Sequence, residues 1–156
     1  MIALDCDGLF ATWRDQARVL LGHGIDPSQV TWLQGPVADL LAVPTALPEG
    51  AGPFRAKVPA ALLSQLEQAA RYRGEHRWNL LYEVLWRVAH GDRTAMLAGD
   101  RLGSELQRRI KQVNREAHHL HAFVRFVPLP EVLAEQLHLD LVACLLYTSD
   151  AADERS

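Results

Sequence analysis

The fold is decided by residues 75–90, EHRWNLLYEVLWRVAH, where apolar side chains leave only a narrow polar stripe. The stripe consists of Asn79, Glu83, Arg87 and His90, which recur at helical spacing. A helix that is apolar on nearly all sides is normally the central, buried helix of a domain. We therefore expect the rest of the chain to pack around this helix, with Glu83 and Arg87 paired across one of its turns.

Three further helices and several short strands are expected around it. Helical spacing of apolar residues predicts helices over residues 9–21 and 60–71, and a long one over residues 101–119. Residues 1–6, 30–33 and 122–127 have strand-like composition, and Pro128 stops the last of these. Residues 34–59 contain five prolines and three glycines, which is typical of a connector. We predict one α+β, helix-rich domain.

Composition indicates a globular protein without a membrane span. The chain has 156 residues, 49% of them hydrophobic and 22% charged, enough for one core but not for two full domains. No apolar run approaches the ~20 residues of a membrane-spanning helix, and the N-terminus lacks the pattern of a secretory signal. We therefore expect a cytoplasmic protein. The two cysteines form neither a disulfide framework nor a zinc pattern, and we identify no cofactor.

Positive charge gathers in the second half of the chain. Between Arg101 and Arg125, six Lys and Arg residues are opposed by two Glu. At ~100° per residue, one side of the expected helix carries Arg108, Lys111, Arg115, His118 and His119. Arg and Lys contacts to phosphates supply the sequence-independent part of nucleic-acid binding. We predict that Arg108, Lys111, Arg115 and Arg125 bind nucleic acid. The alternative is the solvated face of an amphipathic helix.

Acidic and histidine residues form two further candidate sites. The run Asp5-Cys6-Asp7-Gly8 resembles the opening motif of haloacid-dehalogenase-type phosphatases, with Asp5 as the nucleophile and Asp7 as the general acid. Asp100 would mimic the later magnesium-binding acid of that family, although paired acids in such a turn usually cap a helix. His118 and His121 are candidate catalytic or ligand positions. No neighbouring Cys pair or carboxylate completes a metal site, so we predict no metal.

Two stretches carry a resemblance to a known family. They are RWNLLYEVLWRV at 77–88, followed by HGD at 90–92, and REAHHLHAFVRF at 115–126. Together they resemble the domain-of-unknown-function 4130 family, whose members are described as DNA-metabolism proteins. The resemblance implies a DNA-linked role. It also implies a partner, either a radical S-adenosylmethionine protein encoded nearby or a fused uracil-DNA-glycosylase-like domain.

The last residues are expected not to be native. The string CLLYTSDAADE at 144–154 is what the transposase end and adapter of a sequencing library encode when translated in one frame. A segment added in this way would not contribute to the native fold. The native part would then be residues 1–143, a domain whose C-terminal part is missing, because the resembled family continues with an Ala-Trp step and a Pro-Asp-His motif. The alternative is a genuine, frayed terminus.

These patterns favour an accessory protein of DNA metabolism, repair or modification that binds DNA through a basic helix face and whose reaction is undefined. Two rivals stay open. One is the phosphatase that uses Asp5 and Asp7. The other is an interaction module that docks a radical S-adenosylmethionine partner and never touches DNA.

Overall fold

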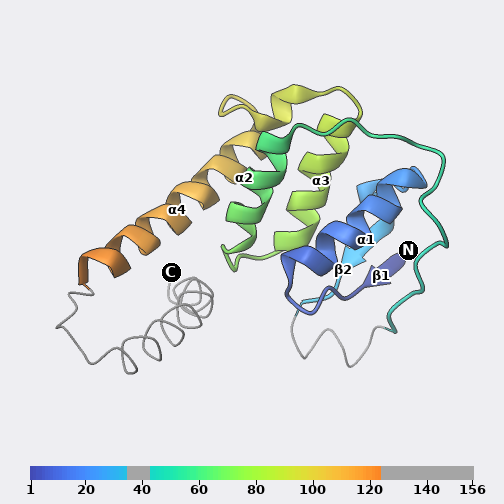
Figure 1. Cartoon of the computed structure of the whole chain (residues 1–156), viewed down its shortest axis with the longest axis horizontal. Coiled ribbons are helices and arrows are strands. Elements are labelled where there is room, and N and C mark those ends of the chain that lie inside the picture. Colours follow the sequence, from blue (N-terminus) through green and yellow to red (C-terminus); the bar gives the residue numbers. More distant parts are fainter. Residues whose placement is uncertain (35–42, 124–156) are drawn as a thin grey trace, which may run out of the picture.

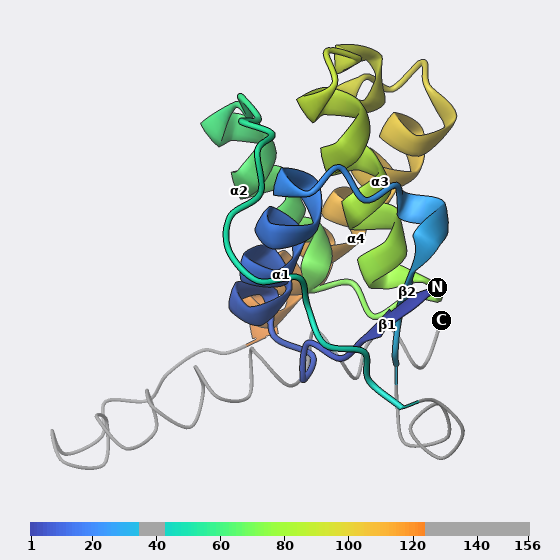
Figure 2. The ribbon, with the colours of Figure 1, turned by 90° about the vertical axis from the view of Figure 1, so that its right-hand side faces the viewer.

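A parallel strand–helix–strand unit opens the chain. The computed structural model describes residues 1–34 and 43–123, shown in colour in Figures 1 and 2. Strand β1 (Ile2–Leu4) lies beside β2 (Val30–Trp32) in parallel, with Leu4 opposite Trp32. Helix α1 (Phe10–Gly22) makes the crossover between them, and the short 3-10 helix η1 (Pro27–Gln29) leads into β2. Both strands expected here are confirmed.

The remaining helices follow a long connector. They are α2 (Ala60–Ala70), α3 (Arg77–Ala89), the 3-10 helix η2 (Arg93–Met96) and α4 (Arg101–Phe123). Figure 1 shows α1, α3 and α2 side by side, with α4 beyond α2 and extending away from the other helices. The α+β, helix-rich fold predicted from the sequence is confirmed. Among the described helices, none combines the length and apolar character needed to cross a membrane.

Aromatic side chains join the first unit to α3. The Trp13 ring lies 6.1 Å from Trp32 and 6.0 Å from Trp78 between ring centroids, and all three side chains are buried. Tyr82 stands edge-on to Trp32 at 6.2 Å and donates its hydroxyl hydrogen to the carbonyl oxygen of Ile25 at 2.6 Å. Aromatic rings of this size bury large apolar areas and so contribute much of the stabilisation of a core. Helix α3 is therefore the central helix, as its apolar sequence predicts.

The connector is fixed to α1 by two glycines. In the described part of the connector, residues 43–59, the chain forms neither helix nor strand, as expected. A Cβ on Gly22 would lie 1.9 Å from the carbonyl oxygen of Ala51, and one on Gly52 would lie 2.2 Å from the Gly22 backbone. The Phe54 N–H also donates to the Gly22 carbonyl at 2.9 Å. The two backbones approach this closely only because both positions lack a side chain.

The end of α4 differs from the prediction. The helix continues through Ala122 and Phe123, where we expected a strand over residues 122–127 to begin. Helical hydrogen bonding carried on from the preceding turns prevails over the local strand-like composition. The other residues of that expected strand, Arg125, and the suspect tail at 144–156 lie outside the described residues.

Substitution of Leu66 tests the contribution of the core to stability. Leu66 of α2 is fully buried in the core. We expect Leu66→Ala to lower the free energy of unfolding by about 2 to 5 kcal/mol, since it removes buried carbon atoms and leaves a cavity. Leu97→Ala, at a position that is 59% exposed, is the matched control. Urea unfolding followed by circular dichroism measures both. Equal losses in the two variants would contradict this account of the core.

Candidate nucleic-acid interface

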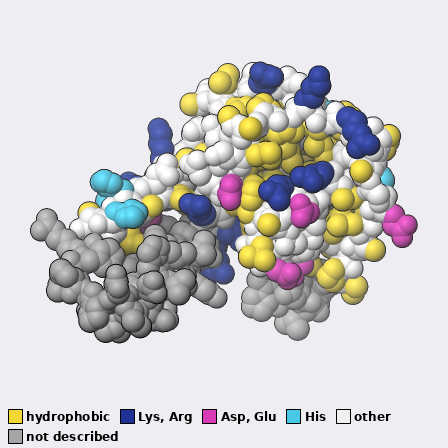
Figure 3. Space-filling model, viewed as in Figure 1, with side chains coloured by type: hydrophobic (Ala, Val, Ile, Leu, Met, Phe, Trp, Pro, Cys, Tyr) yellow, Lys and Arg dark blue, Asp and Glu magenta, His cyan; other side chains and the backbone are white. Residues whose placement is uncertain are grey.

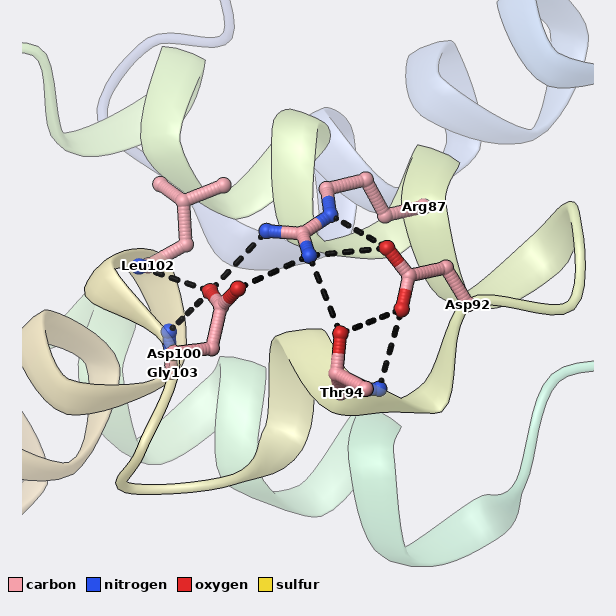
Figure 4. Close-up of polar contacts among 6 residues, drawn as sticks. All are labelled: Arg87, Asp92, Thr94, Asp100, Leu102 and Gly103. Carbon is pink, nitrogen blue, oxygen red and sulfur yellow. Dashed lines mark hydrogen bonds and ion pairs between the residues drawn. The ribbon is translucent and has the colours of Figure 1, made fainter.

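Asp100 fixes the start of α4. Its Oδ1 accepts hydrogen bonds from the backbone N–H groups of Leu102 at 2.9 Å and Gly103 at 3.2 Å, so it caps the first turn (Figure 4). The Arg87 guanidinium, reaching over from α3, donates to both oxygens of Asp100 at 2.9 Å. A carboxylate at a helix N-terminus is favoured because it satisfies free N–H groups and faces the positive end of the helix dipole.

The same guanidinium binds a second carboxylate. Arg87 donates to Oδ2 of Asp92 from Nε at 2.9 Å and from an Nη at 2.7 Å, and Thr94 bonds to both residues. We call Arg87, Asp92, Thr94 and Asp100 the Arg87 cluster. It connects the end of α3, η2 and the start of α4. The expected pairing with Glu83 is replaced by these two carboxylates.

The Arg87 cluster lowers the pKa values of its acids. The side-chain hydrogen bond from Arg87 is the main cause that lowers the pKa of Asp100 to about 2, with the Gly103 and Leu102 N–H groups adding to it. The side-chain hydrogen bond from Thr94, followed by that from Arg87, lowers the pKa of Asp92. Both acids therefore stay ionised at neutral pH.

Close packing at Gly103 sets the path of α4 past η2. A Cβ at Gly103 would lie 2.0 Å from the carbonyl oxygen of Leu97, which is too close for any larger residue. Along the next turns the helix buries one side, which carries Leu102, Leu106, Ile110 and Val113. This is the apolar stripe that the sequence predicts. The basic side chains on the opposite side are thereby turned to solvent.

Arg109 belongs to the interior and not to the basic surface. Only 7% of it is exposed. Its Nε donates to Glu105 at 2.9 Å, an Nη donates to the Glu75 carbonyl oxygen at 3.2 Å, and its guanidinium lies 5.0 Å from the Tyr72 ring centroid. A guanidinium can be buried when its charge is paired and it stacks on an aromatic ring. Arg109 therefore ties α4 to the turn between α2 and α3.

The basic face of α4 consists of Arg108, Lys111, Arg115, His118 and His119, all of them exposed. Figure 3 shows histidine side chains gathered over the C-terminal part of this helix. Arg108 is partly engaged, because it donates to Glu105 at 2.8 and 3.0 Å and to the Tyr72 hydroxyl at 3.3 Å. The hydrogen bonds from Arg108, followed by the one from Arg109, lower the pKa of Glu105 to about 2. Arg115 donates to Gln112 of the same helix.

The other predicted site residues lie elsewhere. Asp5 follows β1 and accepts a hydrogen bond from the Asp7 N–H at 2.8 Å, which closes a tight turn with Asp7 at a φ of 52°. His118 and His121 are exposed near the end of α4, on the opposite side of the molecule from β1 (Figure 1). Asp5 and Asp7 are thus close together, whereas the histidines are remote from both.

The structure shows the contacts of Asp100 and the burial of Cys6, two residues that the phosphatase interpretation involves. Asp100, read from the sequence as a possible magnesium ligand, bonds to Arg87 and caps α4. Burial raises the pKa of the Cys6 thiol to about 11, so this thiol stays protonated at neutral pH. Within residues 1–34 and 43–123, no three His, Cys, Asp or Glu side chains lie together in a way that could hold a metal ion.

Sequence reasoning missed the Arg87 cluster. An acid directly before a predicted helix is an N-cap signal, so the capping role of Asp100 could have been found. Its bond to Arg87 could not, because the two residues are 13 positions apart and meet only after η2 reverses the chain.

Comparison with known protein families gives a match to part of the chain. The model of the domain of unknown function DUF4130 matches residues 75–142, a stretch that includes α3, η2 and α4. The resemblance to this family that the sequence predicts is confirmed over that stretch. No curated protein and no solved structure matches the chain.

The pKa of Asp100 predicts how its contribution depends on pH. Asparagine also caps helices, so Asp100→Asn removes mainly the charge that faces Arg87. A lowered pKa in the folded state stabilises the fold above the ordinary value of 3.8, and this stabilisation is lost as pH falls towards about 2. We expect Asp100→Asn to lower the free energy of unfolding at pH 7, by an amount that shrinks between pH 5 and pH 2.

Urea unfolding over this pH range measures the difference. Glu67→Gln is the control, because Glu67 is an exposed acid on α2. If the difference between wild type and Asp100→Asn were constant with pH, the ion pair with Arg87 would not stabilise the fold.

Proposed function

We propose that this protein binds DNA through the basic face of α4, as an accessory protein in DNA metabolism, repair or modification. One observation carries the proposal. The basic side chains follow one exposed side of a helix whose opposite side is buried against the domain and which extends beyond α2 and α3 (Figure 1). A row of positive charges on such a helix can contact the phosphates of a nucleic acid.

The dimensions of the basic face suit this role. Arg108 and Arg115 are two turns apart, about 10 Å along the helix at about 1.5 Å per residue. B-DNA advances about 3.4 Å along its axis per phosphate of one strand, so the face spans a few phosphates. Two glutamates lie on α4. Glu105 is bound to Arg108 and Arg109, and Glu116 accepts a hydrogen bond from Gln112 at 3.1 Å.

Lys111 and Arg115 are the main expected contacts. Arg108 already donates to Glu105 and to Tyr72, so part of its charge is compensated. Lys111 and Arg115 are exposed one turn apart. Lysine presents a compact charge with three donors, and arginine can bind a phosphate with two parallel hydrogen bonds. Together they make non-specific, salt-dependent contacts with the backbone.

Substitution of these two residues tests the proposal. We expect Lys111→Gln with Arg115→Gln to weaken binding to duplex DNA. The slope of log affinity against log salt concentration should fall by about 2, since each lost phosphate contact removes about 0.9. Fluorescence anisotropy of a labelled duplex at several salt concentrations measures both quantities.

The control removes the same charges elsewhere. Lys57→Gln with Arg93→Gln takes one Lys and one Arg from exposed positions in the connector and in η2. It should leave the slope nearly unchanged. If the control weakens DNA binding as much as the Lys111 and Arg115 substitutions do, binding reflects overall charge and the basic face has no special role.

The family resemblance supports the wider context of the proposal. We place the protein in the cytoplasm, where it would act with a radical S-adenosylmethionine protein or beside a uracil-DNA-glycosylase-like domain. Co-purification with such a partner without any binding to DNA would favour a pure docking role instead.

A further inference from the structure

A groove with an apolar floor and a basic rim lies away from the basic face of α4. It has a volume of about 350 Å³ and lies between α1, the connector around Phe54, and Leu63 and Leu85 of the next two helices. Figure 3 shows an apolar area on this face bordered by Lys and Arg side chains. Pockets that bind small molecules typically measure about 300 to 1,000 Å³.

The connector forms a wall whose position is fixed. Besides the contact between Gly22 and Gly52, the His23 ring is hydrogen-bonded to the Gly50 carbonyl oxygen at 3.2 Å. The Phe54 ring stacks on His90, with centroids 4.9 Å apart and planes 7° apart. These contacts attach the connector to the end of α1 and to the end of α3. The groove is therefore formed before any ligand arrives, which lowers the entropic cost of binding.

The floor of the groove is apolar. Leu21 and Leu85 are each only 5% exposed, and Val58 and Leu63 are half-buried beside them. A ligand that covers this floor removes apolar surface from water, which is favourable at roughly 25 cal/mol per Å². The floor by itself would suit any apolar molecule.

The rim gives the groove its selectivity. Arg14 and Arg18 lie one turn apart on α1, and Arg55 lies on the connector, so three arginine residues line one groove. The residues that line the groove include no Asp or Glu. Arg14 has an exposed ion pair with Asp15 at 3.7 Å, whereas Arg18 and Arg55 have no ion-pair partner within the described ranges.

Gathering like charges in this way does not stabilise the fold. Equal charges one helical turn apart repel by a few tenths of a kcal/mol. An anion bound between the three arginines would offset this repulsion. Arginine binds carboxylate and phosphate with two parallel hydrogen bonds. The arrangement therefore complements a ligand that carries a negative head on an apolar body.

We propose that this groove binds a small organic anion. Its apolar body lies on the floor formed by Leu21, Leu63 and Leu85, and its phosphate or carboxylate head lies between Arg14, Arg18 and Arg55. This site shares no residue with the basic face of α4. It is independent of the proposed binding of DNA.

Two fluorescent probes that differ only in charge test the proposal. The full chain is titrated with 1-anilinonaphthalene-8-sulfonate, which has an aromatic body and an anionic head, and with N-phenyl-1-naphthylamine, which lacks the sulfonate. We expect Arg18→Gln with Arg55→Gln to weaken binding of the sulfonate on the order of tenfold or more. Binding of the neutral probe should hardly change.

Two further variants keep the test falsifiable. Arg71→Gln with Arg93→Gln removes two exposed arginines that do not line the groove, and should bind the sulfonate like wild type. Val58→Trp should weaken both probes by filling the floor, with circular dichroism confirming that the fold is kept. Sulfonate binding that is equal in wild type and in the Arg18 and Arg55 variant overturns the proposal.

Competition then identifies the head group and excludes nucleic acid. Displacement of the sulfonate by decyl phosphate but not by decanoate assigns a phosphate head, and the reverse assigns a carboxylate. Failure of both to displace it overturns the proposal. Displacement by duplex DNA that persists in the Lys111 and Arg115 variant would assign the three arginines to DNA and would also overturn it.

Discussion

One guanidinium group connects the central helix to the start of α4. Arg87, near the end of the central helix, binds Asp92 just before η2 and Asp100 just before α4. Because Asp100 also caps the first turn of α4, the ion pair fixes where that helix begins as well as how it leaves α3. Gly103 then allows α4 to pass against the backbone at Leu97. The orientation of the basic face then follows from burial of the opposite side of α4, because helical periodicity decides which side chains meet solvent.

The regular elements could be predicted because they depend on local periodicity. The apolar stripes of α1, α3 and α4 repeat at helical spacing, and burial against one core preserves them. The same spacing of ~100° per residue explains why Arg109 is buried although its neighbour Arg108 is exposed. That residue lies on the flank of the stripe made by Leu102, Leu106 and Val113, so its side chain enters the interior and finds Glu105 and Tyr72. For Arg109, helical position therefore decides burial, and charge alone does not.

Features that depend on distant contacts were beyond the reach of the sequence. The pairing of Arg87 with Asp100 requires η2 to reverse the chain, and the groove requires the connector to meet α1 at Gly22 and Gly52. Neither contact has a local signature, since prolines and glycines in the connector indicate a loop without showing where it lies. The strand expected over residues 122–127 failed at its first two residues for a related reason. Strand propensity is weak compared with the continuation of an established helix.

The basic face of α4 and the arginine-lined groove differ in the residues that lie beside the positive charges. This difference favours a different class of ligand at each site. On α4 the cations follow one exposed side of a helix, an arrangement that favours many weak contacts along a polyanion. In the groove, three arginines line a space of limited volume together with apolar residues, which favours one compact anion with a large apolar part. Duplex DNA exposes charge but little apolar surface at its backbone, so it gains little from Leu63 and Leu85. A small organic anion gains from both floor and rim, and it leaves the basic face of α4 free.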